Sequence, residues 1–195
     1  MGAMLGLTNS LGAVNAVLLA VGRWLGAGCV ALMVVIILLQ VFFRYVLGDA
    51  LAWPEEAARF LMLWMTGLMA PTAFRCGGFV SIEMLVRFLP KGLAALLTML
   101  LLGLSMVVLI VGIRIGWSEV TGLGGRFTTD SLSVPSLDFS SWIKVPKAWM
   151  MTSLVVGLTL LISVCLELFL RAFATLLGAQ SRLIVIRDAA VVGAE

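Results

Sequence analysis

The charged residues of this chain bracket long stretches that carry no charge at all, and this pattern limits its fold. Neutral stretches run over residues 24–43, 92–113 and 148–166. Each is close to the ~20 residues that a helix needs to cross a hydrocarbon core of about 30 Å. Because a charge at the centre of a crossing helix costs about 2.5–3.5 kcal/mol, uninterrupted runs of this length are typical of transmembrane helices.

A fourth stretch, residues 60–74, is neutral but shorter. Extended back to Pro54 it can cross a bilayer, with Arg59 one turn inside, where a long side chain reaches the interface. The chain is 62% hydrophobic and 12% charged, whereas soluble domains carry about 25% charged residues. We therefore predict an all-α membrane protein with four transmembrane helices in one domain, residues 23–171. The expected spans are residues 24–44, 54–74, 92–114 and 148–170.

Two further amphipathic segments and a tail are predicted around these spans. Residues 1–22 are uncharged but contain Thr8, Asn9, Ser10 and Asn15. Apolar residues recur there at spacings of three and four, namely Leu7, Leu11, Val14, Leu18 and Val21. We interpret this segment as an interfacial amphipathic helix; a cleaved signal peptide is the alternative, although no basic region precedes it. A short amphipathic segment is expected at residues 80–89, and residues 172–195 form a cytoplasmic tail.

Several classes of function lack the residues they need. The chain has no histidine, which excludes His-ligated haem and His-based acid–base catalysis. Cys29, Cys76 and Cys165 are isolated, and no phosphate-binding loop is present. We therefore predict no enzyme activity, no catalytic, cofactor-binding or metal-binding residues, and no nucleic-acid partner. Transporters place ionisable groups or broken helices at mid-membrane, and these spans lack such groups, which favours a scaffold or accessory role.

The polar residues at the ends of the second span are the candidate functional residues. They are Arg44, Trp53, Glu55, Glu56, Arg59 and Arg75. One interpretation is interfacial anchoring and helix capping, since Pro54 and two acids suit the first turn of a helix. The other is docking to a partner through charge pairs at the membrane surface. Arg75 stands at the far end of the span, so the six residues cannot form one site.

Two sequence features concern helix packing and orientation. Gly22 and Gly26, and likewise Gly112 and Gly116, match the spacing that lets membrane helices approach closely. Basic residues divide almost evenly between the two sides of the membrane, so the positive-inside rule gives only a small preference for both termini in the cytoplasm.

The residues around the second span resemble the small membrane subunit, the DctQ-like or Q subunit, of tripartite ATP-independent periplasmic (TRAP) transporters. That family shows an Arg at the end of the first span (Arg44), a short turn, and a Trp with paired acids (Trp53, Glu55, Glu56). An Arg after the span, a Gly pair, an acid in a short apolar segment and a Pro follow. These are Arg75, Gly77-Gly78, Glu83 and Pro90, and Pro146 precedes the last span. The family often has a His or a charge where Gly78 stands.

The resemblance implies a scaffold subunit of a sodium-coupled secondary transporter for an organic acid. It implies a large M subunit that carries the substrate and ion sites, and a periplasmic P protein that delivers the substrate. The location would be the bacterial inner membrane, with both termini cytoplasmic. A haem-free membrane anchor subunit of an oxidoreductase complex is the alternative. The residues that select a substrate would lie in other chains.

Overall fold

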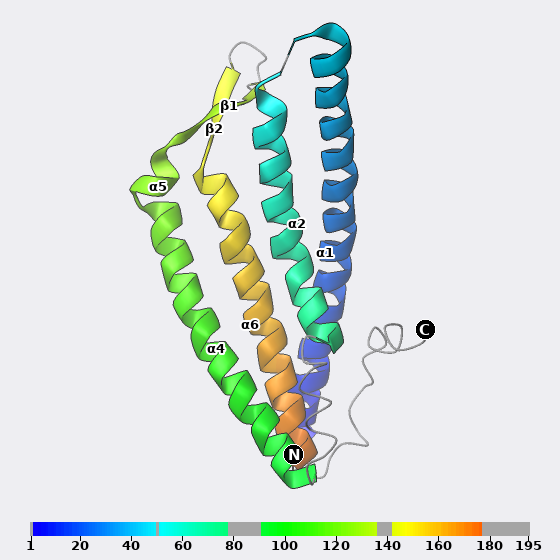
Figure 1. Ribbon diagram of the computed structural model, residues 1–195. Coiled ribbons are helices and arrows are strands. Elements are labelled where there is room, and N and C mark those ends of the chain that lie inside the picture. Colours follow the sequence, from blue (N-terminus) through cyan, green and yellow to red (C-terminus); the bar gives the residue numbers. More distant parts are fainter. Residues whose placement is uncertain (1, 50, 78–90, 136–141, 177–195) are drawn as a thin grey trace.

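The computed structural model describes residues 2–49, 51–77, 91–135 and 142–176. Within them the chain is mostly helical (Figure 1). The four long helices are α1 (Gly2–Phe42), α2 (Trp53–Gly77), α4 (Lys91–Thr121) and α6 (Ala148–Leu176). The predicted amphipathic segment at 80–89 and residues 177–195 of the predicted tail lie outside the described residues.

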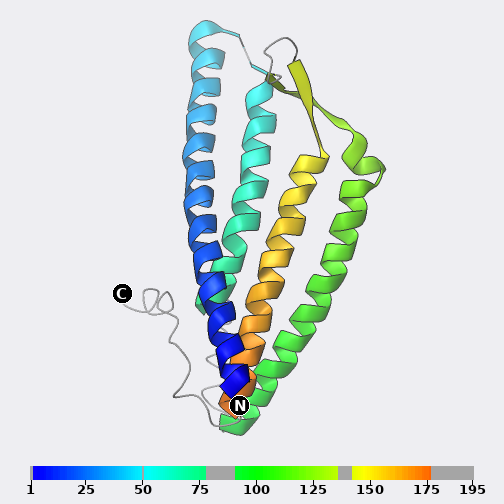
Figure 2. The same ribbon diagram turned by 180° about the vertical axis from the view of Figure 1, so that it is seen from behind.

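The long helices stand side by side in a row (Figures 1 and 2). Along the row α1 packs on α2, α2 on α6, and α6 on α4, while the N-terminal half of α1 also reaches α6. Neighbours α1 and α2 run in opposite directions, as do α6 and α4, whereas α2 and α6 run the same way. A row leaves apolar side chains exposed on both of its faces. A membrane protein can expose such side chains because lipid covers them.

Three helical segments are long and apolar enough to cross a membrane: Thr8–Leu47, Gly92–Thr121 and Ala148–Leu176. Helix α2 has 25 residues but is less apolar, because its ends carry Glu55, Glu56, Arg59 and Arg75 and Pro71 lies inside it. The fourth predicted span, α2, therefore stays a prediction.

Helix α1 is continuous through the expected boundary between an interfacial helix and the first span. Its 41 residues correspond to a length of roughly 60 Å. A π-helical turn, η1 (Phe43–Leu47), follows and ends at Gly48, whose φ of 70° suits glycine. Residues 2–22 are thus part of the same helix as the span, and their interfacial placement stays a prediction.

The N-terminal half of α1 packs through its small and polar residues. The buried positions alternate at spacings of four and three: Thr8, Gly12, Asn15, Leu19, Gly22 and Gly26. The apolar face noted in the sequence points the other way, since Val14, Leu18 and Val21 are about half exposed. Small and polar residues thus make most of the helix contacts in this half of α1, as is common where helices pack closely.

Glycines bring the helices of the row into close contact. A Cβ on Gly26 would lie 2.7 Å from the Met69 side chain, and one on Gly157 would lie 2.8 Å from the Cα of Gly67. Gly112 and Gly116 lie against side chains of α6. Both glycine pairs singled out in the sequence therefore lie at helix contacts, and α2 crosses α6 backbone to backbone at a third glycine pair.

The connection between α4 and α6 contains a β-hairpin, which adds to the predicted all-α fold. After the single turn α5 (Leu123–Arg126), strand β1 (Thr128–Pro135) pairs antiparallel with β2 (Trp142–Pro146). The register shifts between Thr128 and Ser133, so part of β1 bulges out of the ladder. The hairpin lies beside the start of α2. The all-α prediction from the sequence missed these Thr-, Val- and Ile-containing strands.

Candidate functional site

A network of charged and polar side chains joins three helices at the end of the row opposite the hairpin. Its centre is Glu167 of α6, whose side chain is 0% exposed. Oε1 of Glu167 accepts hydrogen bonds from Arg75 of α2 at 2.8 Å and from Nε of Arg171 at 3.0 Å. Oε2 accepts one from Asn15 of α1 at 2.9 Å. Both oxygens of this buried carboxylate are therefore occupied by donors from all three helices.

Further hydrogen bonds tie α1 into the same network. Ser163 donates to Oδ1 of Asn15 at 2.6 Å, and Asn15 donates to the carbonyl of Ser163 at 3.2 Å. Arg75 also donates to the carbonyl of Gly12 at 3.0 Å. Gly12 has no room for a side chain, since a Cβ there would lie 3.0 Å from Oε1 of Glu167. The network thus fixes the N-terminal half of α1 against α2 and α6.

The network carries more positive than negative charge among its named members. Two arginines face one carboxylate, and the Arg75 side chain is only 6% exposed. Nε of Arg75 has no hydrogen-bond partner, although the other end of its guanidinium is well bonded. A buried charge is tolerated only when it is paired and hydrogen-bonded, so Glu167 compensates the buried charge of Arg75.

Sequence reasoning assigned Arg75 to a partner interface and did not select Asn15, Ser163, Glu167 or Arg171. The structure gives Arg75 its partners inside the chain. Two spacings in the sequence could have indicated some of these residues. Asn15 shares the four-and-three spacing of Gly12, Gly22 and Gly26 in α1, and Glu167 and Arg171 stand four apart on one helix.

A second carboxylate, Glu56, anchors the hairpin at the other end of the row. Oε2 of Glu56 accepts hydrogen bonds from the backbone N–H of Ser131 at 2.9 Å and of Leu132 at 2.8 Å. The Ser131 hydroxyl also donates to it at 2.8 Å. These two amides belong to the bulged part of β1, so the carboxylate supplies the acceptor that the strand ladder does not.

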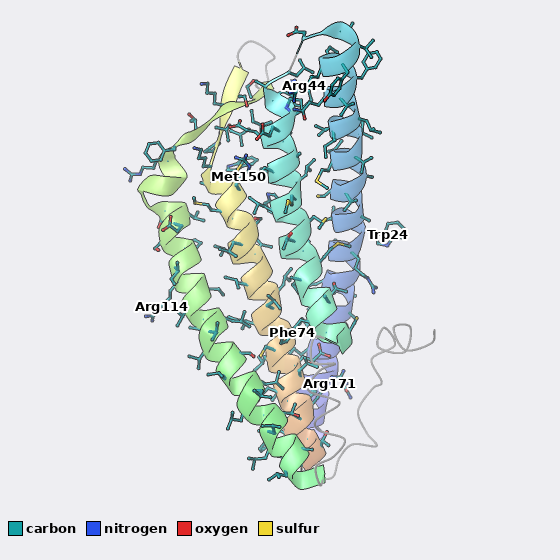
Figure 3. All side chains as sticks on the ribbon, viewed as in Figure 1. Trp24, Arg44, Phe74, Arg114, Met150 and Arg171 are labelled. Carbon is teal, nitrogen blue, oxygen red and sulfur yellow. The ribbon has the colours of Figure 1, made fainter. Side chains whose placement is uncertain are left out.

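The remaining sequence candidates at the hairpin end are more exposed. Glu55 and Arg59 form an i,i+4 pair at 3.2 Å, with side chains 73% and 62% exposed. Arg44 lies over the ring of Tyr45, 5.9 Å from its centroid, in the η1 turn at the top of Figure 3. Trp53 lines a cavity of about 510 Å³ together with Ser131, Leu132 and Ser133 of β1. Of the six predicted residues, Trp53 and Glu56 therefore meet at the hairpin, and Arg75 lies at the opposite end.

These two clusters hold elements together through hydrogen bonds and ion pairs. Within the described parts of the chain, no three His, Cys, Asp or Glu side chains gather in a way that could bind a metal ion. Cys165 is buried and donates to the carbonyl of Leu102 at 3.4 Å. The arrangement is a frame of hydrogen-bonded helices with exposed apolar faces and a folded hairpin at one end.

Comparison with known proteins gives this frame a family. Residues 33–175 match the family model described as tripartite ATP-independent periplasmic transporters, DctQ component. No curated protein and no solved structure matches the chain. The match runs from the last ten residues of α1 to the last turn of α6 and includes both clusters apart from Gly12 and Asn15. The chain belongs to the DctQ component family and is a small membrane subunit of a TRAP transporter.

Proposed function

We propose that this chain is a non-catalytic scaffold subunit that pairs with a large M subunit carrying the substrate and ion sites. The complex would be a sodium-coupled transporter for an organic acid, supplied by a periplasmic P protein, in a bacterial inner membrane. The family assignment favours this role over the oxidoreductase anchor considered from the sequence.

One observation carries the scaffold role. The four long helices continue without a break through their apolar segments. Among the described residues, the carboxylate of Glu167 is buried, and both of its oxygens accept hydrogen bonds, from Arg75, Arg171 and Asn15. Sites that carry ions or solutes use broken helices or ionisable groups free to change partners. A saturated network suits a part that stays still while another subunit moves.

The proposed topology has four spans with both termini in the cytoplasm. Helix α2 is the fourth span, because it lies between α1 and α6 in the row and contacts both. The hairpin, η1 and the start of α2 then face the periplasm, on the side where a periplasmic binding protein would approach. Arg44, Trp53, Glu55 and Arg59 are accordingly proposed to lie at or near subunit interfaces.

Reconstitution tests the scaffold role directly. Proteoliposomes that contain this chain alone should take up no organic acid under an inward sodium gradient. Those that also contain the M subunit and its binding protein should do so. Uptake by the chain alone would contradict the proposal. The side of the termini is checked with a membrane-impermeant reagent on a cysteine added after Glu195, in cells whose outer membrane has been permeabilised.

A further inference from the structure

The apolar runs of neighbouring helices are out of step along the row. Asn15 of α1 bonds to Ser163 and Glu167 of α6, and Cys165, between these two, bonds to Leu102 of α4. Asn15 and Leu102 therefore lie at the same level. Leu102 is in the middle of the neutral run 92–113, whereas Asn15 precedes the neutral run 24–43 by nine residues, about two and a half turns.

The contacts nearer the hairpin show the same offset. A Cβ on Gly112 would lie 3.2 Å from Leu158, so the end of the α4 run is level with the middle of the α6 run. The two central helices are in step with each other, since Arg75 and Glu167 pair just beyond the ends of their runs. The runs thus shift in opposite directions at the two edges of the row.

Aromatic residues follow the same oblique line. A Tyr or Trp lies within three residues of the hairpin-side limit of each predicted span, and each of these four side chains is at least 36% exposed: Tyr45, Trp53, Trp149 and Trp117. Such residues mark the interface between a bilayer and water. The hairpin-side ends of the helices step down from α1 through α2 and α6 to α4 (Figures 1 and 2).

We infer that the bilayer crosses the row obliquely, so that acyl chains cover α1 and α4 at different levels of the molecule. Consider a hydrocarbon core that is perpendicular to the helices and centred on α2 and α6. It would enclose Arg23 on α1, at one edge of the row, and Arg114 on α4, at the other edge. Arg114 is exposed and points away from the row (Figure 3), so it would meet lipid directly. An oblique core places both arginines at its surfaces, where they reach water.

The lipid-covered surface then differs between the edges of the row. On α4 it reaches down to Leu93, and on α1 it ends near Trp24, an 82% exposed side chain that points outward (Figure 3). The exposed residues Val14, Val17 and Val21 of α1 lie beyond the core, toward the headgroups. This inference goes beyond the scaffold role and depends only on the chain being in a membrane.

Matched pairs of surface residues at equal levels test the oblique placement. Val14 and Leu104 are 56% and 60% exposed, and Leu25 and Ile115 are 54% and 58% exposed. Each is replaced by cysteine in the full chain lacking Cys29, Cys76 and Cys165, labelled with a nitroxide, and placed in phospholipid nanodiscs. The depth is measured as the ratio of collisions with oxygen to collisions with a water-soluble nickel chelate.

The expected ratio is several-fold higher at Leu104 than at Val14. Leu25 and Ile115 lie near opposite surfaces of an oblique core, so each should give a lower ratio than Leu104. Ratios at Leu25 and Ile115 above that at Leu104 would overturn the inference and leave a perpendicular placement, which puts those two residues near the centre of the core. A site shielded from both collision agents would also overturn it, because protein and not lipid would then cover that site. Water contact at all four sites would contradict membrane insertion itself, which the proposed function requires. Val17 and Val107, also exposed, replace the first pair if a variant does not fold.

Discussion

The two ends of the row each depend on one glutamate, but the two carboxylates have different partners. Glu167 faces two arginines and an asparagine from three helices and is fully buried. Glu56 accepts from backbone amides and a hydroxyl of one bulged strand and is partly exposed. Loss of the Glu167 carboxylate therefore leaves a buried arginine without a counter-charge. Loss of the Glu56 carboxylate only removes the acceptor of amides that water can reach. The first should control helix assembly, and the second should control only the hairpin.

The largest effect is expected from Glu167→Gln. Arg75 would then lie buried without a carboxylate, and breaking such a pair costs about 3–5 kcal/mol. Unfolding of the purified chain in mixed micelles, followed by helical circular dichroism, measures the loss. Glu119→Gln, at an exposed site on α4, is the control and should change little.

A double variant separates charge pairing from packing at the same place. Glu167→Met together with Arg75→Met should be more stable than Glu167→Gln, because buried ion pairs are often replaced by apolar residues at little net cost. The coupling between the two positions is obtained from a double-mutant cycle. If the two single changes simply add, Arg75 and Glu167 do not act as a pair and the comparison between the two ends of the row fails.

Helices α2 and α6 cross between the two ends of the row. Gly67→Ala tests whether this close crossing contributes to the stability of the whole row. A Cβ at Gly67 would lie 2.5 Å from the carbonyl oxygen of Ser153, so the helices must separate. Overpacking of this kind costs about 1–3 kcal/mol. Gly103→Ala, with open space around it, is the matched control. Equal stability of the two variants would show that the close crossing is not needed.

A smaller and local effect is expected from Glu56→Gln. The amide keeps one acceptor oxygen but loses the charge, and a hydrogen bond to a charged group contributes about 1.5–3 kcal/mol. Hydrogen exchange of the Ser131 and Leu132 amides should become faster while the four helices keep their protection. Faster exchange throughout α2 and α6 would mean that Glu56 supports the whole row.

The smallest effect is expected from Glu55→Gln, because its pair with Arg59 is solvent-exposed and such pairs contribute about 0–1 kcal/mol. Glu55 and Glu56 are also predicted to support assembly, so the double Gln variant should co-purify less M subunit than the unchanged chain. Comparison with each single variant assigns the loss. An unchanged yield of complex would leave these acids with capping and hairpin anchoring alone.

The sequence predicted which segments are long, apolar helices suited to cross a membrane. It did so because charged residues avoid the hydrocarbon core, so their spacing along the chain marks the limits of such segments. It also indicated the family through Arg44, Trp53, Glu55, Glu56 and Arg75, a prediction that the family match confirms. It placed Pro54, Glu55 and Glu56 correctly in the first turn of α2. It described residues 1–22 by their apolar face, although the polar and small face is the one that packs.

Only the tertiary structure decided which groups meet. Glu56 and Ser131 are 75 residues apart, and Asn15 and Glu167 are 152 apart, distances over which no local pattern specifies a contact. The same holds for the row itself, since apolar helices of equal length pack as a bundle or as a row. The sequence determined this chain's membrane segments because the bilayer acts on each helix alone. The fold decided the partners of its buried charges, because a charge is satisfied only by the side chains that packing brings to it.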